Sequence, residues 1–243
     1  MNVIDAVRQR RATKKFDPDF VIPLNEKKAL LSLAMENAPS AFNLQHWRPL
    51  LVEDPAQRRN IRKVGWDQPQ MTDASMLVIL CGDVAAWSSR PREIWRDADP
   101  LVRDFMVNAV DNYYRGKPET QRDEIMRSAG IFAQTLMLLA KAQGYDSCPM
   151  DGFDFNAVAE VIDLPENYEI CLMVAIGKSA GEPYPRIGKL PFDQLVSIDV
   201  FILICRNIIC LSPAAVSRQP SPFMSSVSVE SSLQSIFSRE IYL

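Results

Sequence analysis

The alternation of apolar and polar residues predicts a chain in which helices interleave with a few strands. Five segments carry apolar residues at helical spacing or helix-end signals, namely 2–11, 23–40, 100–116, 119–143 and 155–164. Short apolar runs bounded by turn residues predict strands at 49–53, 75–83 and 168–178. We therefore expect one α/β-type domain of roughly 200 residues.

Residues at the helix ends sharpen this prediction. Asn25 is a candidate N-cap for the second helix, and Pro100 suits the first turn of the third. Gly144 follows the fourth helix as a typical C′ residue, and Asp154 is expected to cap the fifth. Residues 129–140 of the fourth helix are apolar almost all round, which predicts burial in a core or in an interface.

The end of the chain differs in composition from the rest. Segment 202–243 contains ten serines and five charged residues but no glycine and no lysine. One alternative is a membrane anchor at about 198–216, although Asp199 and Arg206 interrupt its apolar run. The other alternative, which we favour, is a segment that is poorly ordered or that a frameshift or read-through has produced. We expect residues 1–201 to form the domain and 202–243 an atypical tail.

The charge is slightly acidic overall but basic near the N-terminus. The 243 residues carry a net charge of −3, which argues against a broad nucleic-acid surface. Arg8, Arg10, Arg11, Lys14 and Lys15 nevertheless lie within eight residues that contain no acid. This cluster indicates a small anionic ligand, unless it is only a solvated face.

Cysteine and histidine usage excludes several kinds of chemistry. The five cysteines form no CxxC pair and the chain has one histidine, so we expect no metal site. The N-terminus lacks the apolar core of a secretory signal, which predicts a cytoplasmic location. The histidine, His46, is either structural, which we favour, or an acid–base group. Because no nucleophile–base pair can be argued from the sequence, we expect the chemistry to belong to a cofactor.

Three loop stretches carry further candidate chemistry. The stretch 38–49 reads APSAFNLQHWRP, the stretch 148–154 reads CPMDGFD, and the stretch 183–191 reads PYPRIGKLP. Taken singly, they are better explained as a connector, a plain turn and an exposed basic loop. Their order and spacing together are far more specific.

These stretches and the basic cluster resemble the motifs of the nitroreductase family of FMN-dependent NAD(P)H oxidoreductases. Residues 10–16, RRATKKF, match the opening motif of the family, and PSAFNLQHW at 39–47 matches its second motif. PMDGFD at 149–154 matches the turn that follows a long helix, and RIGKLP at 186–191 matches the closing basic segment. The resemblance covers residues 1 to about 200.

The resemblance implies a fold, a partner and two cofactors. The expected fold is α+β in three α/β/α layers, with a mixed, largely antiparallel central sheet flanked by helices, in an intertwined homodimer. The expected cofactors are FMN and NAD(P)H. The expected reaction is reduction of a nitroaromatic, a quinone or a similar electron-poor small molecule by ping-pong hydride transfer, with no nucleic-acid or membrane partner. The alternatives are a specialised flavoenzyme of the same fold, such as a dehalogenase or a flavin-destroying enzyme, and a non-catalytic module that binds anions or nucleic acid.

The resemblance also implies site residues. Lys14 is expected at the N1–O2 edge of the flavin, and a backbone N–H of the 150–152 turn, best that of Asp151, is expected to donate to N5. Ser40 and Asn43 are expected to come from the partner chain. The full set of expected cofactor-binding residues is Arg10, Arg11, Ala12, Lys14, Pro39, Ser40, Ala41, Asn43, Asp67, Gln70, Pro149, Met150, Asp151, Gly152, Arg186 and Lys189.

The chain departs from the family pattern at three positions. Ala12 replaces a serine and His46 replaces a proline. Asp67 stands where relatives often have an asparagine, and its carboxylate would repel a reduced, anionic flavin. Gln68 or Gln70 is therefore the alternative for the contact beside the pyrimidine part of the flavin.

Overall fold

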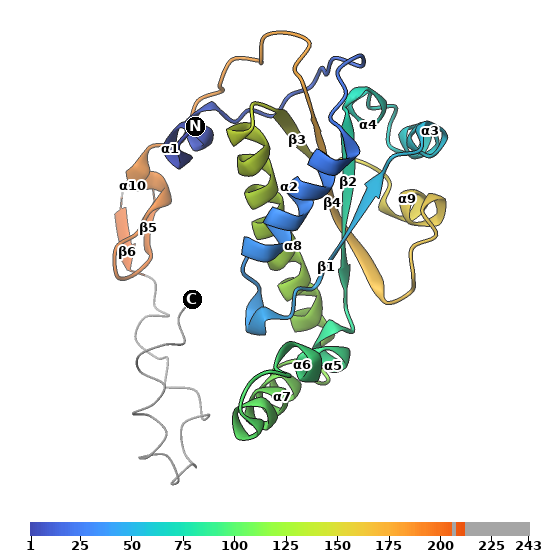
Figure 1. Cartoon of the computed structure of the whole chain (residues 1–243). Helices are drawn as coiled ribbons and strands as arrows, with labels where there is room; N and C mark the ends of the chain where they lie inside the picture. Colours follow the sequence, from blue (N-terminus) through green and yellow to red (C-terminus); the bar gives the residue numbers. More distant parts are fainter. Residues whose placement is uncertain (206–207, 212–243) are drawn as a thin grey trace. The chain divides into compact units, whose positions relative to one another are not determined.

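The structure, a computed structural model, describes residues 1–205 and 208–211. The chain divides into two compact units, Met1–Tyr184 and a second that begins at Pro185. The first unit contains a four-stranded antiparallel sheet with helices on both faces (Figure 1). In the second unit the structure describes a short helix, α10 (Phe192–Leu195), and a hairpin of β5 (Ile202–Cys205) and β6 (Ile208–Leu211).

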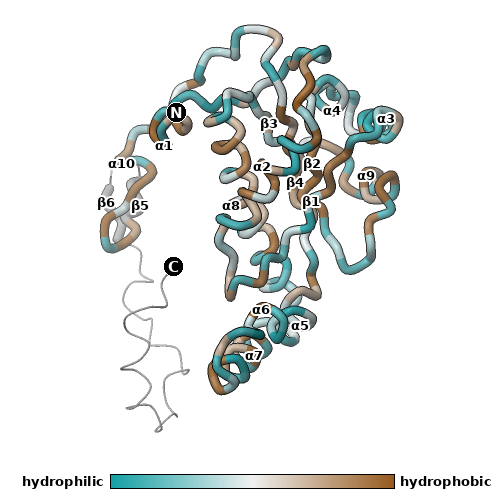
Figure 2. Tube along the Cα trace, viewed as in Figure 1, coloured by the Kyte–Doolittle hydropathy of each residue, from teal (hydrophilic) through white to brown (hydrophobic). Residues whose placement is uncertain are grey.

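The sheet places its two longest strands at the centre. Its order is β1 (Trp47–Val52), β2 (Met76–Asp83), β4 (Tyr168–Gly177) and β3 (Asp146–Met150), and every neighbouring pair is antiparallel. All eight residues of β2 are buried, because helices cover both of its faces. Figure 2 shows that the central strands are the most hydrophobic part of this unit.

Two helices cover each face of the sheet. On one face, α2 (Leu24–Asn37) and α8 (Pro118–Ala142) pack against the alternate strand residues that include Val78 and Val174. On the other face, α3 (Pro55–Val64) and α9 (Phe155–Val161) pack against those that include Ile79 and Met173. The remaining elements of this unit are α1 (Val3–Gln9), η1 (Ala41–Asn43), α4 (Gln70–Asp73), α5 (Ala86–Ser89), α6 (Pro91–Ile94) and α7 (Pro100–Tyr114). The three-layer α+β prediction is thus confirmed.

Most of the predicted elements are present, with one wrong cap. The five predicted helices correspond to α1, α2, α7, α8 and α9, and the three predicted strands to β1, β2 and β4. Asp154 caps α9 by accepting from the Ala157 N–H at 3.0 Å, and Gly144 has a φ of +85° after α8. Asn25 is not an N-cap, because α2 begins at Leu24 and Asn25 lies inside its first turn.

The apolar segment of α8 is buried on one side only. Phe132 and Leu136 are fully buried in the core, whereas Ile131 is 42% exposed. Burial in a core therefore accounts for the inner face of this helix and leaves its outer face open in the single chain.

The predicted tail begins inside the second unit. The structure describes β5 and β6 there, and residues 206–207 and 212–243 lie outside the described residues. Among the residues described, no helix is long and apolar enough to cross a membrane. The boundary at 201 and the nature of the tail stay predictions.

Candidate functional site

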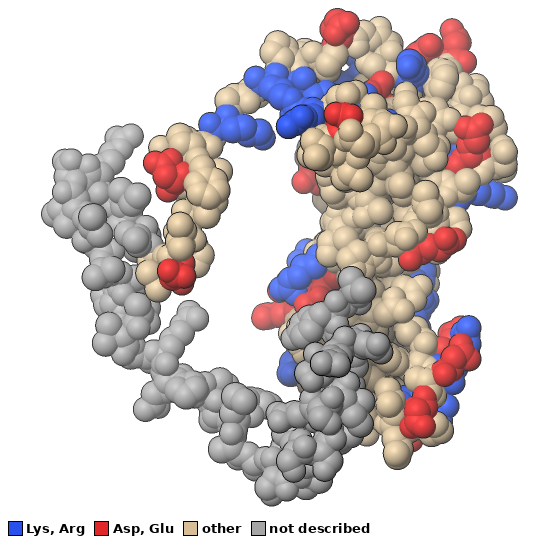
Figure 3. Space-filling view, turned by 60° about the vertical axis from the view of Figure 1, so that its left-hand side comes forward, with Lys and Arg blue, Asp and Glu red and all other residues tan. Residues whose placement is uncertain are grey.

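The basic segment near the N-terminus runs beside the edge strand β3. The Thr13 N–H donates to the Ser147 carbonyl at 3.0 Å, and Ala12 forms a parallel bridge with Ser147. Thr13 and Phe16 are buried, whereas Lys14 is exposed. Extended backbone therefore fixes which side chains of the segment reach the surface. Figure 3 shows acidic and basic side chains mixed over the face of the first unit that it presents.

Lys14 lies against a buried thiol. Its Nζ is 3.5 Å from Sγ of Cys148, and Gln70, which is also buried, hydrogen-bonds to the same thiol. Burial raises the pKa of Cys148, with Lys14 and Gln70 acting in the opposite direction, so the thiol is neutral at pH 7. Lys14 forms none of the ion pairs found among the described residues. No carboxylate of the described residues therefore pairs with its positive charge.

The turn that follows β3 presents free backbone donors. The Phe153 N–H donates to the Asp151 carbonyl at 3.2 Å, and the Gln68 side chain donates to the Gly152 carbonyl at 2.6 Å. Within the described chain, the N–H groups of Asp151 and Gly152 donate to no acceptor. These two N–H groups are open to an added acceptor, so the turn can donate to a ligand that accepts hydrogen bonds.

The loop between α3 and α4 packs against this turn. Trp66 and Asp67 have φ values of +56° and +52°, which are uncommon for residues other than glycine. A Cβ on Gly152 would lie 3.2 Å from the Trp66 ring, so glycine allows this close approach. Trp66 itself is 68% exposed. The loop therefore forms one wall of the space in front of the 150–152 turn.

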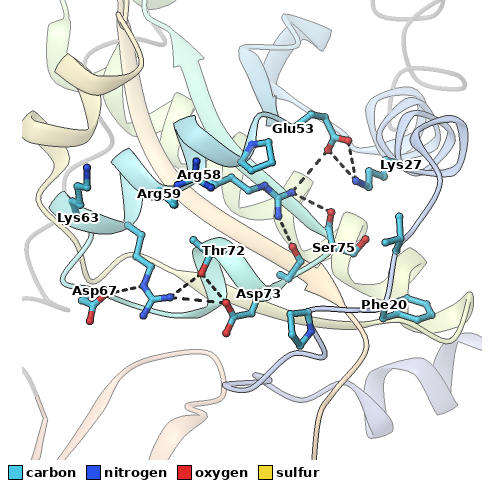
Figure 4. Close-up of a pocket in the computed structure, with 15 residues that line it drawn as sticks. Phe20, Lys27, Glu53, Arg58, Arg59, Lys63, Asp67, Thr72, Asp73 and Ser75 are labelled. Atoms are coloured by element: carbon cyan, nitrogen blue, oxygen red, sulfur yellow. Dashed lines mark hydrogen bonds and ion pairs between the residues drawn. The ribbon is translucent and has the colours of Figure 1, made fainter.

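Asp67, Gln68 and Gln70 make different contacts in the structure. Gln70 joins Lys14 at the Cys148 thiol, and Gln68 bonds the Gly152 carbonyl. Asp67 instead accepts from Arg62 at 2.7 Å (Figure 4). The assignment of Asp67 or Gln70 to the cofactor stays a prediction.

Two cavities flank the loop and the basic segment. The larger, of about 730 Å³, lies between α3, α4 and residues 18–21, and Figure 4 shows that ion pairs hold most of its charged side chains. Arg58 is buried there, with its guanidinium on the carbonyls of Val52, Ala74 and Ser75. The smaller, of about 230 Å³, is lined by Lys14, Lys15 and residues 179–184. Of the predicted site residues, Asp67 lines the larger cavity and Lys14 lines the smaller one.

The loop at 39–45 lies at the start of β1. Ser40 Oγ accepts from the Gln45 N–H at 2.9 Å, and Phe42, Asn43 and Gln45 all have positive φ. Pro39 and Asn43 are exposed. No hydrogen bond or ring contact found among the described residues joins this loop to Lys14 or Cys148. The structure thus keeps Pro39, Ser40, Ala41 and Asn43 apart from the other site residues of the same chain.

His46 is a buried residue beside that loop. Its Nδ1 lies 3.3 Å from Ser128 Oγ, and its ring contacts Tyr114 edge-on. Burial, with the nearby positive charge of Arg48, lowers its pKa to about 4. A neutral, enclosed imidazole at neutral pH agrees with the structural role and not with acid–base catalysis.

The resemblance implies that Arg10, Lys189 and Arg186 bind the FMN phosphate and that Arg11 reaches the ribityl or phosphate region. The first unit contains the two residues near the N-terminus, and the second unit contains the other two. Arg11 donates to the Tyr184 carbonyl, and Arg10 lies at the C-terminal end of α1. Arg186 and Lys189 are exposed in the second unit, outside any helix or strand. Their grouping around one phosphate stays a prediction.

Sequence reasoning missed Cys148 and Trp66 as site residues. The sequence analysis placed Cys148 in a loop stretch, and the pairing of β3 with the 10–16 segment brings Lys14 to it. Trp66 follows Gly65 at the end of α3, a helix that the apolar pattern does not reveal. Nothing local in either stretch signals the contact.

Comparisons with known proteins identify the family of the chain. The family model described as "Nitroreductase family" matches residues 7–178. The chain is 49% identical over 203 residues to protein DrgA from Synechocystis sp., across 82% of this chain and 96% of that protein. It is 30% identical over 193 residues to the NADH dehydrogenase of Thermus thermophilus, across 79% and 93%. A crystal structure from Exiguobacterium sibiricum, in complex with FMN, has a TM-score of 0.74 at 25% identity and covers 82% of this chain and 97% of its own.

Proposed function

Because the chain belongs to the nitroreductase family, we propose that it is an FMN-dependent oxidoreductase. We infer that it takes reducing equivalents from NAD(P)H and delivers them to small electron-poor acceptors, such as nitroaromatics and quinones, in a ping-pong cycle. One observation carries the proposal. The Lys14 ammonium lies 3.5 Å from the Cys148 thiol of β3 and has no carboxylate partner among the described residues, and the turn that follows this strand has two N–H groups that donate to no acceptor there.

These residues fit an isoalloxazine ring. The ring accepts hydrogen bonds at N5 and gathers negative charge at N1 and O2 when it is reduced, and the free amides and Lys14 are complementary to these two features. FMN, when bound, supplies hydride transfer at N5. The relatives named above support the choice of cofactors, since one is named as an NADH dehydrogenase and one is in complex with FMN.

The protein residues would act by charge and by orientation. The Lys14 ammonium would stabilise negative charge at the N1–O2 edge, and its neighbour, the neutral Cys148 thiol, carries no charge that would offset it. The Asp151 or Gly152 N–H donates to N5, and this role does not need the exposed Asp151 carboxylate. Met150 is buried and Pro149 lies in β3, so both position the turn.

The remaining predicted residues would bind the rest of the cofactor. Arg10, Arg11, Arg186 and Lys189 would bind the phosphate, with each charge-assisted hydrogen bond contributing about 1.5–3 kcal/mol. Ala12 offers only its backbone for this purpose. Pro39, Ser40, Ala41 and Asn43 would reach the flavin of the partner subunit, which agrees with their separation from Lys14 in one chain.

We further propose that the protein forms a homodimer. Val3, Ile4 and Val7 lie on α1 and are 72%, 61% and 52% exposed, and Ile131 is exposed on α8. Apolar groups exposed together favour an interface between proteins. Light scattering on the purified protein should give twice the chain mass, and Ile4→Glu should shift it toward the monomer. A wild-type monomer at micromolar concentration would contradict the dimer.

We also propose a cytoplasmic location. The cysteines Cys81, Cys148 and Cys171 of the described chain are free thiols, which suits a reducing compartment.

The visible spectrum of the purified protein tests the main proposal. We expect flavin absorption bands, present on purification or after addition of FMN, that bleach on addition of NADH or NADPH and return on addition of a quinone. A protein that stays colourless and does not retain added FMN would overturn the proposal.

A further inference from the structure

We propose that Gln68 is a positioning residue that orients the Gly152 N–H of the Met150–Gly152 turn. The inference rests on the proposed function, since this N–H is one of the two donors expected to bind the flavin. One hydrogen bond joins the loop that carries Gln68 to this turn, which lies far away in the sequence.

The bond runs from the Gln68 side chain to the turn. Gln68 Nε2 lies 2.6 Å from the Gly152 carbonyl oxygen and 3.3 Å from the Gly65 carbonyl oxygen. Gln68 is half-buried, so the bond is partly shielded from water. Both protons of the side-chain amide therefore have acceptors, and the amide has one preferred orientation.

This bond determines the direction of the next donors along the chain. The Gly152 carbonyl and the Phe153 N–H belong to one planar peptide group, so fixing the carbonyl also fixes the N–H. The Phe153 N–H donates to the Asp151 carbonyl at 3.2 Å. The Asp151 carbonyl and the Gly152 N–H belong to one planar peptide group. The N–H points in the direction opposite to the carbonyl and donates to no acceptor among the described residues. Gln68 thus holds the turn in the conformation that presents its amide.

The loop that carries Gln68 is itself anchored on α3. Arg62 Nε donates to Asp67 Oδ1 at 2.7 Å, and the Asp67 N–H donates to the Arg62 carbonyl at 3.1 Å (Figure 4). Trp66 packs on Gly152 from the same loop. These contacts therefore connect α3, through the loop that carries Gln68, to the Met150–Gly152 turn.

A purely structural role for Gln68 is the competing explanation, and the chain contains a matched control. Gln57 Nε2 donates to the Val161 carbonyl, also at 2.6 Å, and joins α3 to α9. This bond has the same chemistry and length but does not involve the 150–152 turn. Equivalent substitutions at the two glutamines should cost similar stability, and only those at Gln68 should alter the flavin.

The experiment compares Gln68→Met and Gln68→Glu with Gln57→Met and Gln57→Glu in the full-length protein. Methionine keeps the length but removes the donor, and glutamate places an acceptor against the carbonyl. We measure thermal unfolding, the dissociation constant of FMN and the midpoint potential of bound FMN. We expect the Gln68 variants to bind FMN roughly 3- to 10-fold more weakly, with a shifted potential. The Gln57 variants should match the wild type in both flavin measurements.

Lowering the pH should restore FMN binding by the Gln68→Glu variant. Protonated glutamate is again a hydrogen-bond donor, so Gln68→Glu should recover FMN affinity relative to the wild type as the pH falls through about 4.3, the ordinary pKa of glutamate. Gln68→Met should show no such recovery relative to the wild type at the same pH. This difference does not depend on how much stability either variant loses.

The outcomes separate the two proposals. A wild-type protein that binds no FMN would overturn the proposed function and this inference with it. A wild type that binds FMN, with Gln68 variants that keep its FMN affinity and potential, would overturn the inference alone. Flavin changes of equal size in the Gln57 variants would also overturn it, because the effect would then follow from stability.

Discussion

At the scale of single residues, Lys14 is notable because its neighbour is a neutral thiol and not a carboxylate. Lys14→Ala should slow reduction of FMN by NAD(P)H by about 10- to 100-fold, since the fixed charge stabilises the developing negative charge. FMN affinity should fall only modestly, because the phosphate ligands remain. Stopped-flow bleaching of the flavin measures the rate. Lys15→Ala, next to it and also exposed, is the control, and equal rates in all three proteins would refute the role of Lys14.

His46 gives a second prediction, which concerns stability. Its pKa is 6.5 in a model peptide and about 4 in the native protein. Between these values the unfolded chain binds a proton that the native chain does not. The free energy of unfolding should therefore fall as pH falls from 6.5 toward 4, by at most about 1.4 kcal/mol per pH unit from this group.

The single histidine makes this test specific. His46→Gln should lower stability at pH 7 but flatten the loss between pH 6.5 and 4, as measured by urea unfolding at several pH values. The same slope in both proteins would contradict the lowered pKa.

For the candidate site, the sequence analysis named Lys14 and the 150–152 turn. It did not predict the contacts with Cys148 and Trp66 that position them. The motif at 10–16 and the turn residues have recognisable local chemistry. Cys148 and Trp66 act through contacts with residues far away in the chain, and their own neighbours in sequence carry no sign of it.

At the scale of elements, the packing of α8 on β2 depends on a glycine. A Cβ on Gly82 would overlap Cγ2 of Ile125, which is buried on α8. Gly82→Ala should therefore lower the free energy of unfolding by about 1–3 kcal/mol. Urea denaturation measures this value.

The partner residue gives the control for that prediction. Ile125→Ala alone leaves a cavity, but together with Gly82→Ala it removes the overlap, so the double variant should lose less stability than the two single losses combined. Strictly additive losses would show that the two residues do not meet.

The elements that the apolar pattern did not predict have physical reasons for being missed. Helix α3 buries Arg58 and Ile61, and the buried arginine is satisfied by three backbone carbonyls, which no pattern of apolar residues reveals. Strand β3 contains Asp146, Ser147 and Pro149, which are rare in strands. It forms because it is an edge strand, where a proline is tolerated.

At the scale of the whole molecule, the division into two compact units leads to a prediction about FMN binding by shortened chains. A chain that ends at Phe201 keeps Arg186 and Lys189, whereas one that ends at Tyr184 loses both. The first should bind FMN like the full-length protein, and the second should bind it about 10-fold or more weakly, because charge-assisted bonds to the phosphate are lost. Fluorescence titration with FMN checks this. Weak binding by the longer fragment would show that residues beyond 201 are needed, and tight binding by the shorter one would exclude Arg186 and Lys189 from the phosphate site.

The central position of β2 has a consequence for how the protein is made. Met76 pairs with Ile176, so the main partner of β2 is synthesised about a hundred residues later. At 5–20 residues per second, this strand, whose first six residues are apolar, remains uncovered for about 5–20 s on the ribosome before β4 can pair with it. During that interval β2 exposes a strand edge of the kind that chaperones bind and that aggregates recruit. The yield of this protein in cells should therefore depend more on the rate of translation between β2 and β4 than on the final stability of the fold.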